Sequence, residues 1–270
     1  MMMDLQGVLE EVKQLAVEVG TFISKQRETF DLSRVESKHS HDYVSYVDKE
    51  SERMIVARLK EILPEAGFIT EEKTTEQQGG NSSLLWVVDP LDGTTNFIHD
   101  LAPYCVSIAL RDEKELLLGV VYEVTRKELY SATKGGGAYL NGTPIHVSSL
   151  SDMDEALVMI GYPYNAEEYR PFCLNLTGQL YGHCASLRSN GSAEVELCYV
   201  ASGKIDVYVE SYIQPWDVAA GACILQEAGG TVSDYDGGDE YWMSGRQVVA
   251  TNGKLHPRIL EELRRAEQGG

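Results

Sequence analysis

The 270-residue sequence predicts an α+β fold, because helical and strand-like segments follow one another in a mixed order and the strands cluster in the middle of the chain. Apolar residues recur every three or four positions over residues 5–23, which is the period of an amphipathic helix. Short apolar runs separated by turn residues begin at residue 67 and are typical of strands. The length suits a single α/β-type enzyme unit with an extensive core.

The remaining elements follow from the same patterns. A second helix is predicted after Asp48 and ends before Pro64. Strands are predicted at 67–70, 84–88, 105–110 and 116–124, and Asn141-Gly142 predicts a hairpin turn. Beyond residue 150, strands are expected at 156–160, 205–210 and 248–251, and helices at 167–180, 192–201, 216–228 and 257–266. No linker composition divides the chain, and residues 73–83 are interpreted as a surface loop.

Composition disfavours several classes of function. The formal net charge of -19 and the pI of about 4.7 argue against a nucleic-acid binder and against passive docking on anionic lipid. Five scattered cysteines without a C-x-x-C pair indicate reduced thiols in a cytoplasmic protein. The first residues lack the features of a signal peptide, and no apolar run approaches the length needed to span a membrane.

The most informative segment is the run WVVDPLDGTTNF at residues 86–97. An apolar strand delivers Asp89 to its end, and Gly93 permits the positive φ of a tight turn. Such a turn can present the carboxylates of Asp89 and Asp92, the Leu91 carbonyl and the Thr94 hydroxyl to one side. These are hard oxygen ligands of the kind that magnesium requires. Asp89 or Asp92 alone would be an ordinary residue of a turn, but the whole run favours a metal site.

Further acids strengthen this interpretation. Glu71 and Glu72 end the apolar run 67–70, although alone they would be a solvated loop. Asp217 stands in WDVAAG at a predicted helix start, where an N-cap is the alternative, and Asp48 could likewise simply cap its helix. If Glu71, Asp89, Asp92 and Asp217 converge, their repulsion would raise their pKa values, and divalent cations would neutralise them and attract a phosphate dianion.

On these two segments, DPLDGTTNF and WDVAAG in this order, the chain resembles the inositol monophosphatase family within the lithium-sensitive, magnesium-dependent phosphatases. The resemblance covers nearly the whole chain. It implies Mg²⁺ as cofactor, bound as two or three ions. It also implies hydrolysis of a phosphate monoester by a metal-activated water, with myo-inositol monophosphate as the leading substrate and millimolar lithium as an inhibitor.

The resemblance assigns roles to individual residues. The first magnesium would be held by Glu71, Asp89, the Leu91 carbonyl and Thr94, and the second by Asp89, Asp92 and Asp217. Glu72 would join Glu71 at a third ion through water. Catalysis would use Asp48 and Thr94, which would orient the attacking water, together with Glu71.

Substrate contacts are also implied by the resemblance. The Gly93 and Thr94 amides would cradle phosphate. Substrate hydroxyls would be read by Asp92, by Gly191, Ser192 and Ala193, and by Glu210. Without the resemblance, 191–193 would be a plain helix N-terminus and Glu210 a solvent charge at a strand end. Lys38 stands where related enzymes carry a basic residue near the metals, and would otherwise be a surface lysine.

The family fold is a layered αβαβα sandwich and usually a homodimer. We therefore expect one unit over 1–270, in which about 1–150 carries most metal ligands and 151–270 carries Asp217 and the substrate-hydroxyl contacts. Two segments depart from the family pattern, at 99–103 and at 214–215, and both bear on substrate identity.

Several alternatives remain at this level. Related enzymes act on fructose 1,6-bisphosphate, 3′-phosphoadenosine 5′-phosphate or histidinol phosphate, and a phosphatidylinositol phosphate headgroup is a further candidate. Thr94-Thr95-Asn96-Phe97 favours the inositol branch, because the nucleotide branch usually has lysine after the first threonine. A non-catalytic binding protein on the same fold is the weaker alternative, since every expected ligand is present. The expected partner is a small phosphorylated polyol, without nucleic acid or stable membrane association.

Overall fold

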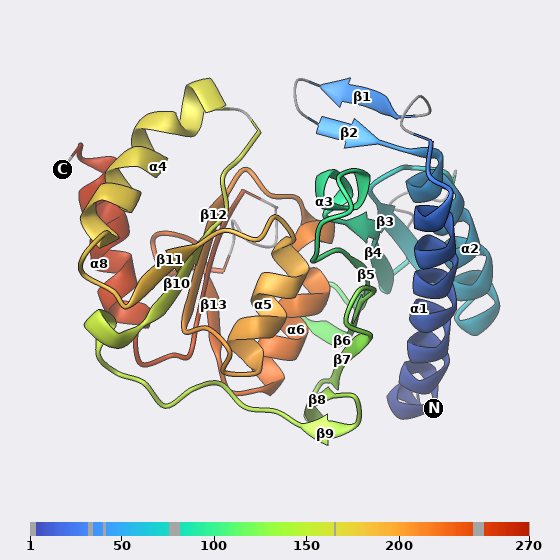
Figure 1. Cartoon of the computed structure of the whole chain (residues 1–270). Coiled ribbons are helices and arrows are strands. Elements are labelled where there is room, and N and C mark those ends of the chain that lie inside the picture. The colour runs from blue at the N-terminus through green and yellow to red at the C-terminus, as the bar shows by residue number, and fades with distance from the viewer. Residues whose placement is uncertain are drawn as a thin grey trace.

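Five layers in the order helix, sheet, helix, sheet, helix make up the molecule, as Figure 1 shows. The structure is a computed structural model, and it describes residues 4–31, 35–39, 42–75, 82–164, 166–239 and 246–269. A seven-stranded sheet comes from the first half of the chain and a five-stranded sheet from the second. The predicted α+β class and the αβαβα layering are therefore confirmed.

The seven-stranded sheet has the order β3-β4-β5-β6-β7-β8-β9. Its strands are β3 (Gly67–Thr70), β4 (Leu85–Asp92), β5 (Cys105–Arg111), β6 (Leu116–Glu123), β7 (Glu128–Thr133), β8 (Gly137–Leu140) and β9 (Thr143–Pro144). Only β3 and β4 pair in parallel among these strands, and the remaining pairs are antiparallel. Every residue of β6 is buried, because helices cover both faces of the sheet. This explains why residues 116–122 contain no charged side chain and do not alternate between apolar and polar.

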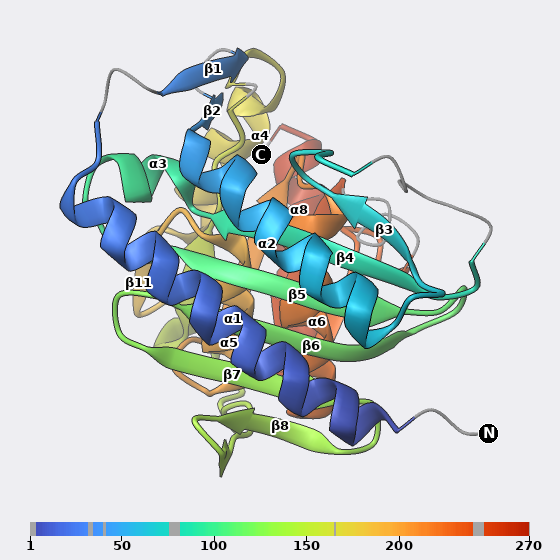
Figure 2. The same cartoon turned by 90° about the vertical axis from the view of Figure 1, so that its right-hand side faces the viewer.

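Two helices, α1 (Leu5–Glu28) and α2 (Tyr46–Ile62), lie across the outer face of this sheet, as Figure 2 shows. The apolar stripe of α1 is fully buried at Val12, Val19 and Ile23, which confirms the predicted helical period. Ser45 is the N-cap of α2, and Asp48 closes a capping box with it. Asp48 is thus the third helical residue and not the cap itself.

The five-stranded sheet has the order β11-β10-β12-β14-β13. Its strands are β10 (Leu157–Ile160), β11 (Ser186–Arg188), β12 (Val207–Ser211), β13 (Thr231–Ser233) and β14 (Gln247–Thr251). The outer face is covered by α4 (Ala166–Leu180) and α8 (His256–Glu267). Leu176, Val209 and Leu263 belong to the apolar cluster between these two helices and the sheet.

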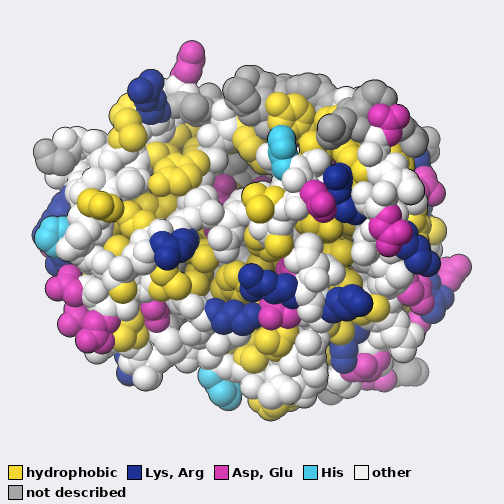
Figure 3. Space-filling view, in the orientation of Figure 1, with side chains coloured by type: hydrophobic (Ala, Val, Ile, Leu, Met, Phe, Trp, Pro, Cys, Tyr) yellow, Lys and Arg dark blue, Asp and Glu magenta, His cyan; other side chains and the backbone are white. Residues whose placement is uncertain are grey.

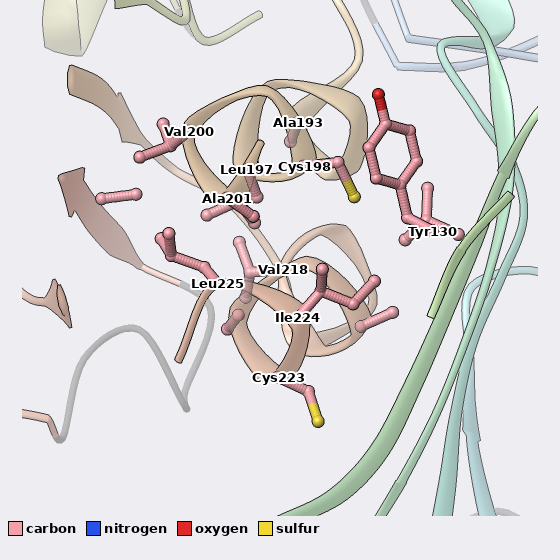
Figure 4. Close-up of a cluster of buried hydrophobic side chains, with 14 of the residues drawn as sticks. Tyr130, Ala193, Leu197, Cys198, Val200, Ala201, Val218, Cys223, Ile224 and Leu225 are labelled. Atoms are coloured by element: carbon pink, nitrogen blue, oxygen red, sulfur yellow. The ribbon is translucent and has the colours of Figure 1, made fainter. Parts of the chain in front are cut away.

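The central layer consists of α5 (Ala193–Ala201) and α6 (Ala219–Glu227), and both sheets pack on it. In Figure 4, Cys198 and Ile224 point towards the strand that carries Tyr130, while Val200 and Leu225 point to the opposite side. All nine residues of α5 are buried, as expected for a helix enclosed on both faces.

Most of the predicted elements are present, and their ends lie within five residues of the expected ones. The predicted helix at 216–228 is instead the 3₁₀ turn η3 (Pro215–Asp217) followed by α6. The hairpin strands β1 (Glu36–His39) and β2 (Asp42–Val44), and also β7, β11 and β13, were not predicted. Short elements complete the chain, namely α3 (Thr94–Ile98) and η2 (Met153–Glu155).

Two composition-based expectations can also be compared with the structure. All five cysteines are free thiols, and four of them are buried. Among the described helices, none is both long and apolar enough to cross a membrane. The predicted loop at 73–83 lies partly outside the described residues.

Gly119 of β6 sets how closely α6 approaches the seven-stranded sheet. A Cβ atom there would lie 2.4 Å from the Ala220 carbonyl oxygen and 3.0 Å from Cys223 Cβ. We expect Gly119→Ala to lower the free energy of unfolding by about 1–3 kcal/mol, because backbone atoms have to move apart. Urea unfolding measures this change.

Gly178→Ala is the matched control. Gly178 lies within α4, and a Cβ atom there meets nothing within 4 Å. This substitution should raise the free energy of unfolding by up to about 1 kcal/mol. Equal stability of the two variants would contradict the close approach described at Gly119.

Candidate functional site

An irregularity in β4 brings two predicted ligands to one side of the sheet. Asp89 pairs with Ser107 and Asp92 with Cys105, so three steps along β4 face two steps along β5. In a regular strand, residues three apart point to opposite faces, whereas a bulge with one extra residue restores the same face. Asp89 and Asp92 accordingly line the same cavity.

Gly93 follows the bulge and starts α3. Its φ of 89° lies in the left-handed region, and a Cβ atom would come within 3.0 Å of the Pro103 oxygen and 3.2 Å of the Gly191 oxygen. Only glycine meets both requirements without strain, which confirms the tight turn expected from the sequence. The turn leaves Thr94 Oγ1 3.0 Å from the Leu91 carbonyl oxygen, so these two predicted ligands are neighbours.

Asp48 reaches the same turn from α2. Thr94 Oγ1 lies 2.8 Å from Asp48 Oδ1, while Asp48 Oδ2 accepts hydrogen bonds from the Ser45 amide at 2.9 Å and the Ser45 hydroxyl at 2.6 Å. Burial raises the pKa of Asp48, and these hydrogen bonds partly offset the rise. Asp48 is therefore not the N-cap that the sequence allowed: it completes the capping box of Ser45 and also accepts a hydrogen bond from Thr94.

Asp92 is held by the second half of the chain. Its Oδ2 accepts hydrogen bonds from Ser192 Oγ at 2.7 Å and from the Glu194 amide at 2.9 Å. Ser192 occupies the N-cap position of α5 but makes no side-chain cap bond there, because its hydroxyl serves Asp92 instead. The alternative of a plain helix N-terminus at 191–193 therefore does not describe Ser192, and the predicted substrate contacts of these residues stay a prediction.

Glu194 joins the two central helices. Its carboxylate accepts hydrogen bonds from the amides of Ala220 and Gly221 at the start of α6, whose N-cap residue Val218 supplies no side-chain cap. Burial, followed by the nearby Asp92 charge, raises the pKa of Glu194 to about 8. Glu194 was not predicted from the sequence, although acids within a largely apolar helix, here Glu194 and Glu196, indicate buried polar contacts.

Asp217 and Glu71 complete the acidic group. Asp217 lies in η3, and its Oδ2 accepts a hydrogen bond from the Gln214 amide at 2.6 Å. It is not the N-cap of α6, which was the alternative considered from the sequence. Glu71 follows β3, and its amide donates to the Val88 carbonyl at 3.3 Å, which continues the pairing with β4.

The acids act on one another electrostatically. Burial raises the pKa of Asp89 well above its usual value, and the charges of Glu71, Asp92 and Asp217 raise it further. The pKa of Asp217 is likewise raised by burial and then by Glu71 and Asp92. Like charges have such an effect at short range in a poorly solvated site. The structure brings these acids together, because Glu71, Asp89, Asp92 and Asp217 line one cavity.

Two cavities adjoin at this point. The smaller, of about 80 Å³, contains most predicted ligands; it is lined by Tyr43, Glu71, Asp89, Leu91, Asp92, Gly93, Thr94, Thr95, Tyr164 and Asp217. The larger, of about 240 Å³, shares Asp92, Gly93 and Asp217 with it and adds Gly191, Ser192, Ala193 and Glu210. Figure 3 shows acidic side chains at the bottom of a hollow that hydrophobic side chains border.

The mouth of the larger cavity is aromatic. Tyr162, Tyr164 and Tyr212 line it and are each about half exposed, at 50%, 51% and 48%. Tyr212 has a left-handed φ of 64°, which is an uncommon backbone conformation for a residue with a bulky side chain. Its ring packs against the ring of Tyr169, and the two ring centroids are 5.7 Å apart. These tyrosines were not identified from the sequence, because exposed aromatic residues carry no distinctive spacing.

Two predicted residues have a different place. Glu72 does not line either cavity in the described part of the chain, and its amide donates to Glu52 at 2.7 Å. Lys38 lies in β1, but its side chain is outside what the structure describes.

The donors around the smaller cavity suit a hard cation, because carboxylate, carbonyl and hydroxyl oxygens are the ligands that Mg²⁺ prefers. Within the described residues, no three His, Cys, Asp or Glu side chains form a group ready to hold a metal ion. Asp89, Asp92 and Asp217 are turned towards protein donors, which is the expected response of acids that repel one another. The observation that fits them to a cation is that their carboxylates line one cavity together with Glu71, the Leu91 carbonyl and Thr94.

The comparison with known proteins agrees with this geometry. The model of the inositol monophosphatase family matches residues 4–268. This chain belongs to that family. Members of this family are generally Mg²⁺-dependent phosphatases, and membership supports a metal-dependent phosphatase.

Individual relatives of this inositol monophosphatase family member carry two kinds of name. The protein named Nus factor SuhB of Escherichia coli K12 is 40% identical over 260 residues, covering 96% of this chain and 97% of its own. The solved structure of the extragenic suppressor protein suhB from Bartonella henselae has a TM-score of 0.89 and 30% identity, covering 95% of this chain and 98% of its own. The IMPase from Thermotoga maritima has a TM-score of 0.87 and 31% identity, covering 97% and 99%.

Glu210 provides a test of burial at the cavity. Burial raises its pKa from 4.5 to about 7, and its Oε2 accepts a hydrogen bond from Tyr208. The native state thus keeps a proton that the unfolded chain releases near pH 4.5, so stability present below that pH is lost as the pH rises through 7. In metal-free protein, we therefore expect the free energy of unfolding of Glu210→Gln to rise by about 2–3 kcal/mol relative to that of wild type as the pH increases from 5 to 8.

Urea unfolding at several pH values in this range measures the difference. Glu113→Gln, at an exposed glutamate of the β5–β6 turn, controls for the general effect of removing one negative charge. A constant difference between Glu210→Gln and wild type across the range would contradict the burial of an ionisable group at this cavity.

Proposed function

We propose that this chain hydrolyses the phosphate monoester of a small polyol, with myo-inositol monophosphate as the leading candidate substrate. The carrying observation is that four acids, Glu71, Asp89, Asp92 and Asp217, line one small cavity. The charges of the neighbouring acids also raise the pKa of Asp89 and of Asp217. A site of this kind gains from bound cations, and cations in turn attract a phosphate dianion. The relative from Thermotoga maritima, which is named IMPase, supports the choice of substrate.

The residues that would hold magnesium are those around the smaller cavity. Glu71, Asp89, the Leu91 carbonyl and Thr94 would hold one ion, and Asp92 and Asp217 would share a second with Asp89. Glu72 would act at a third ion only through water. Bound magnesium would supply a Lewis acid for the phosphoryl group and would lower the pKa of an attacking water.

The protein's own groups would orient that water. Thr94 Oγ1 and Asp48 Oδ1 are 2.8 Å apart, so the pair can hold a water and direct its proton towards a buried carboxylate. The raised pKa of Asp48 suits it to receive a proton. Glu71 would complete this catalytic group from the end of β3.

Substrate recognition would use the larger cavity. Gly93 and Thr94 amides would contact phosphate, while Asp92, Glu210 and residues 191–193 would accept or donate hydrogen bonds to hydroxyl groups. The tyrosines at the mouth would pack on the apolar face of a polyol ring. Lys38 is proposed near the metals on the family pattern alone.

A binding role is the second candidate, because relatives at about 40% identity are named Nus factor SuhB. Partners other than a small molecule, protein or nucleic acid included, would use surface outside the metal site. A substitution that abolishes phosphate release would then leave partner binding intact, which separates the two functions.

Asp92→Asn should lower kcat by at least about 100-fold, because it weakens a metal ligand while keeping an oxygen that Ser192 Oγ can donate to. Phosphate release and circular dichroism are measured together. Asp206→Asn is the matched control: Asp206 also accepts a hydroxyl and an amide hydrogen bond, from Ser148 and Leu157, but does not line either cavity. Near-normal turnover by folded Asp92→Asn would refute the proposal.

A phosphate-release panel with magnesium tests the substrate. It compares inositol 1-phosphate, fructose 1,6-bisphosphate, 3′-phosphoadenosine 5′-phosphate, histidinol phosphate and a phosphoinositide lipid. We expect the highest kcat/KM for inositol 1-phosphate and inhibition by millimolar lithium at saturating magnesium. Preference for any other member of the panel, or a flat lithium response, would count against the inositol assignment.

A further inference from the structure

Glu52 is a fully buried carboxylate on α2 that the proposed chemistry does not use. Its relative exposure is 0%, although glutamate is rarely buried without partners. It stands four residues after Asp48, so the two side chains leave the same face of the helix. Asp48 contacts the turn after β4, whereas Glu52 contacts the segment after β3.

Glu52 accepts three hydrogen bonds from the segment that follows β3. The Glu72 amide donates to Oε2 at 2.7 Å. The Thr74 amide donates to Oε1 at 2.6 Å, and the Thr74 hydroxyl donates to the same oxygen at 2.7 Å. Both carboxylate oxygens are therefore engaged by one short loop.

The backbone of this loop needs such support. Lys73, between the two donating amides, has a left-handed φ of 52°, which costs a residue with a side chain about 1–2 kcal/mol. This conformation turns the amides of Glu72 and Thr74 towards one point, where an anion stabilises them. The anion at that point is the Glu52 carboxylate.

Glu71 lies directly beside this loop. Its own amide is bound to the Val88 carbonyl of β4, and the next amide is bound to Glu52. The Glu71 backbone is thus fixed between β4 on one side and α2 on the other. These two attachments hold the backbone of a residue that lines the same cavity as Asp89 and Asp217.

We propose that Glu52 is a positioning residue: its carboxylate fixes the loop at 71–74 and thereby sets the affinity of the acidic site for magnesium. The proposal rests on the proposed function. It makes α2 the element that holds both ligand-bearing turns, through Asp48 at Thr94 and through Glu52 at Glu72 and Thr74.

Glu52→Gln is the main test, since it keeps the shape of the side chain but places an NH₂ group against an amide donor. Calorimetric titration with MgCl₂, with and without inorganic phosphate, should show at least about tenfold weaker binding. Glu52→Gln should raise the magnesium concentration that gives half-maximal activity. The KM for inositol 1-phosphate, measured at saturating magnesium, should change by a smaller factor. A purely structural role would lower stability without this selective change.

Glu123→Gln is the matched control. Glu123 is equally buried and also accepts two amides and a threonine hydroxyl, from Thr125 and Arg126, but its turn carries no proposed ligand. The magnesium affinity of Glu123→Gln should stay within about twofold of the wild-type affinity, because substitutions at independent sites do not affect one another. Thr74→Val removes one donor from the loop side and should weaken binding by about three- to tenfold, which tests the contact if Glu52→Gln does not fold.

Hydrogen exchange of the metal-free protein separates this proposal from the proposed function. Amides at 72–74 should exchange faster in Glu52→Gln, or in Thr74→Val, than in wild type. If wild type takes up no magnesium and releases no phosphate, the proposed function fails while faster exchange still supports the fixing of the loop by Glu52. Unchanged exchange, or unchanged magnesium affinity in both variants of a magnesium-binding wild type, overturns the proposal.

Discussion

Repulsion between buried acids is the constraint around which this molecule is organised. Glu71, Asp89, Asp92 and Asp217 come from three separate stretches of the chain and line one cavity. Burial raises the pKa of Asp89, Asp92 and Asp217, and the charges of neighbouring acids raise the pKa of Asp89 and Asp217 further. An isolated loop could not hold such a group together, because nothing would oppose its separation. The five packed layers, with a core on each side of both sheets, supply the opposing free energy.

Helices adjoining the site oppose this repulsion locally. On one side, α2 contacts the turns after β3 and β4 through Glu52 and Asp48. On the other, the start of α5 donates to Asp92 through Ser192 and the Glu194 amide. The acids are therefore oriented by hydrogen bonds within the protein, and such preorganisation lowers the cost of binding a charged ligand.

The sequence predicted what depends on local pattern. The period of α1 and the turn at Gly93 follow from adjacent residues, and the structure agrees with them. The ligand character of residues 86–97 stays a prediction, and the structure places Asp89, Leu91, Asp92 and Thr94 around one cavity. The hairpin β1–β2 and the short strands β11 and β13 have three or four residues each, too few for a period to emerge.

Other features depend on partners that are distant in the chain. The bulge between Asp89 and Asp92 exists only relative to β5, and the second attachment of Asp92 comes from a residue 100 positions away. Glu52 could have been noticed, because it follows Asp48 by one helical turn. Its role could not, since the loop that it holds begins 20 residues later and adopts its shape only when α2 and β3 are in place.

The shared central layer has a consequence for assembly. Asp89 belongs to the seven-stranded sheet, whereas Asp217 and Ser192 adjoin the helices on which both sheets pack. A partly folded chain in which only the first sheet has formed would lack Asp217 at the site. It would therefore bind cations weakly. Cation binding would therefore require that the two halves of the chain have packed together. By mass action, each bound cation would make separation of the two halves less favourable.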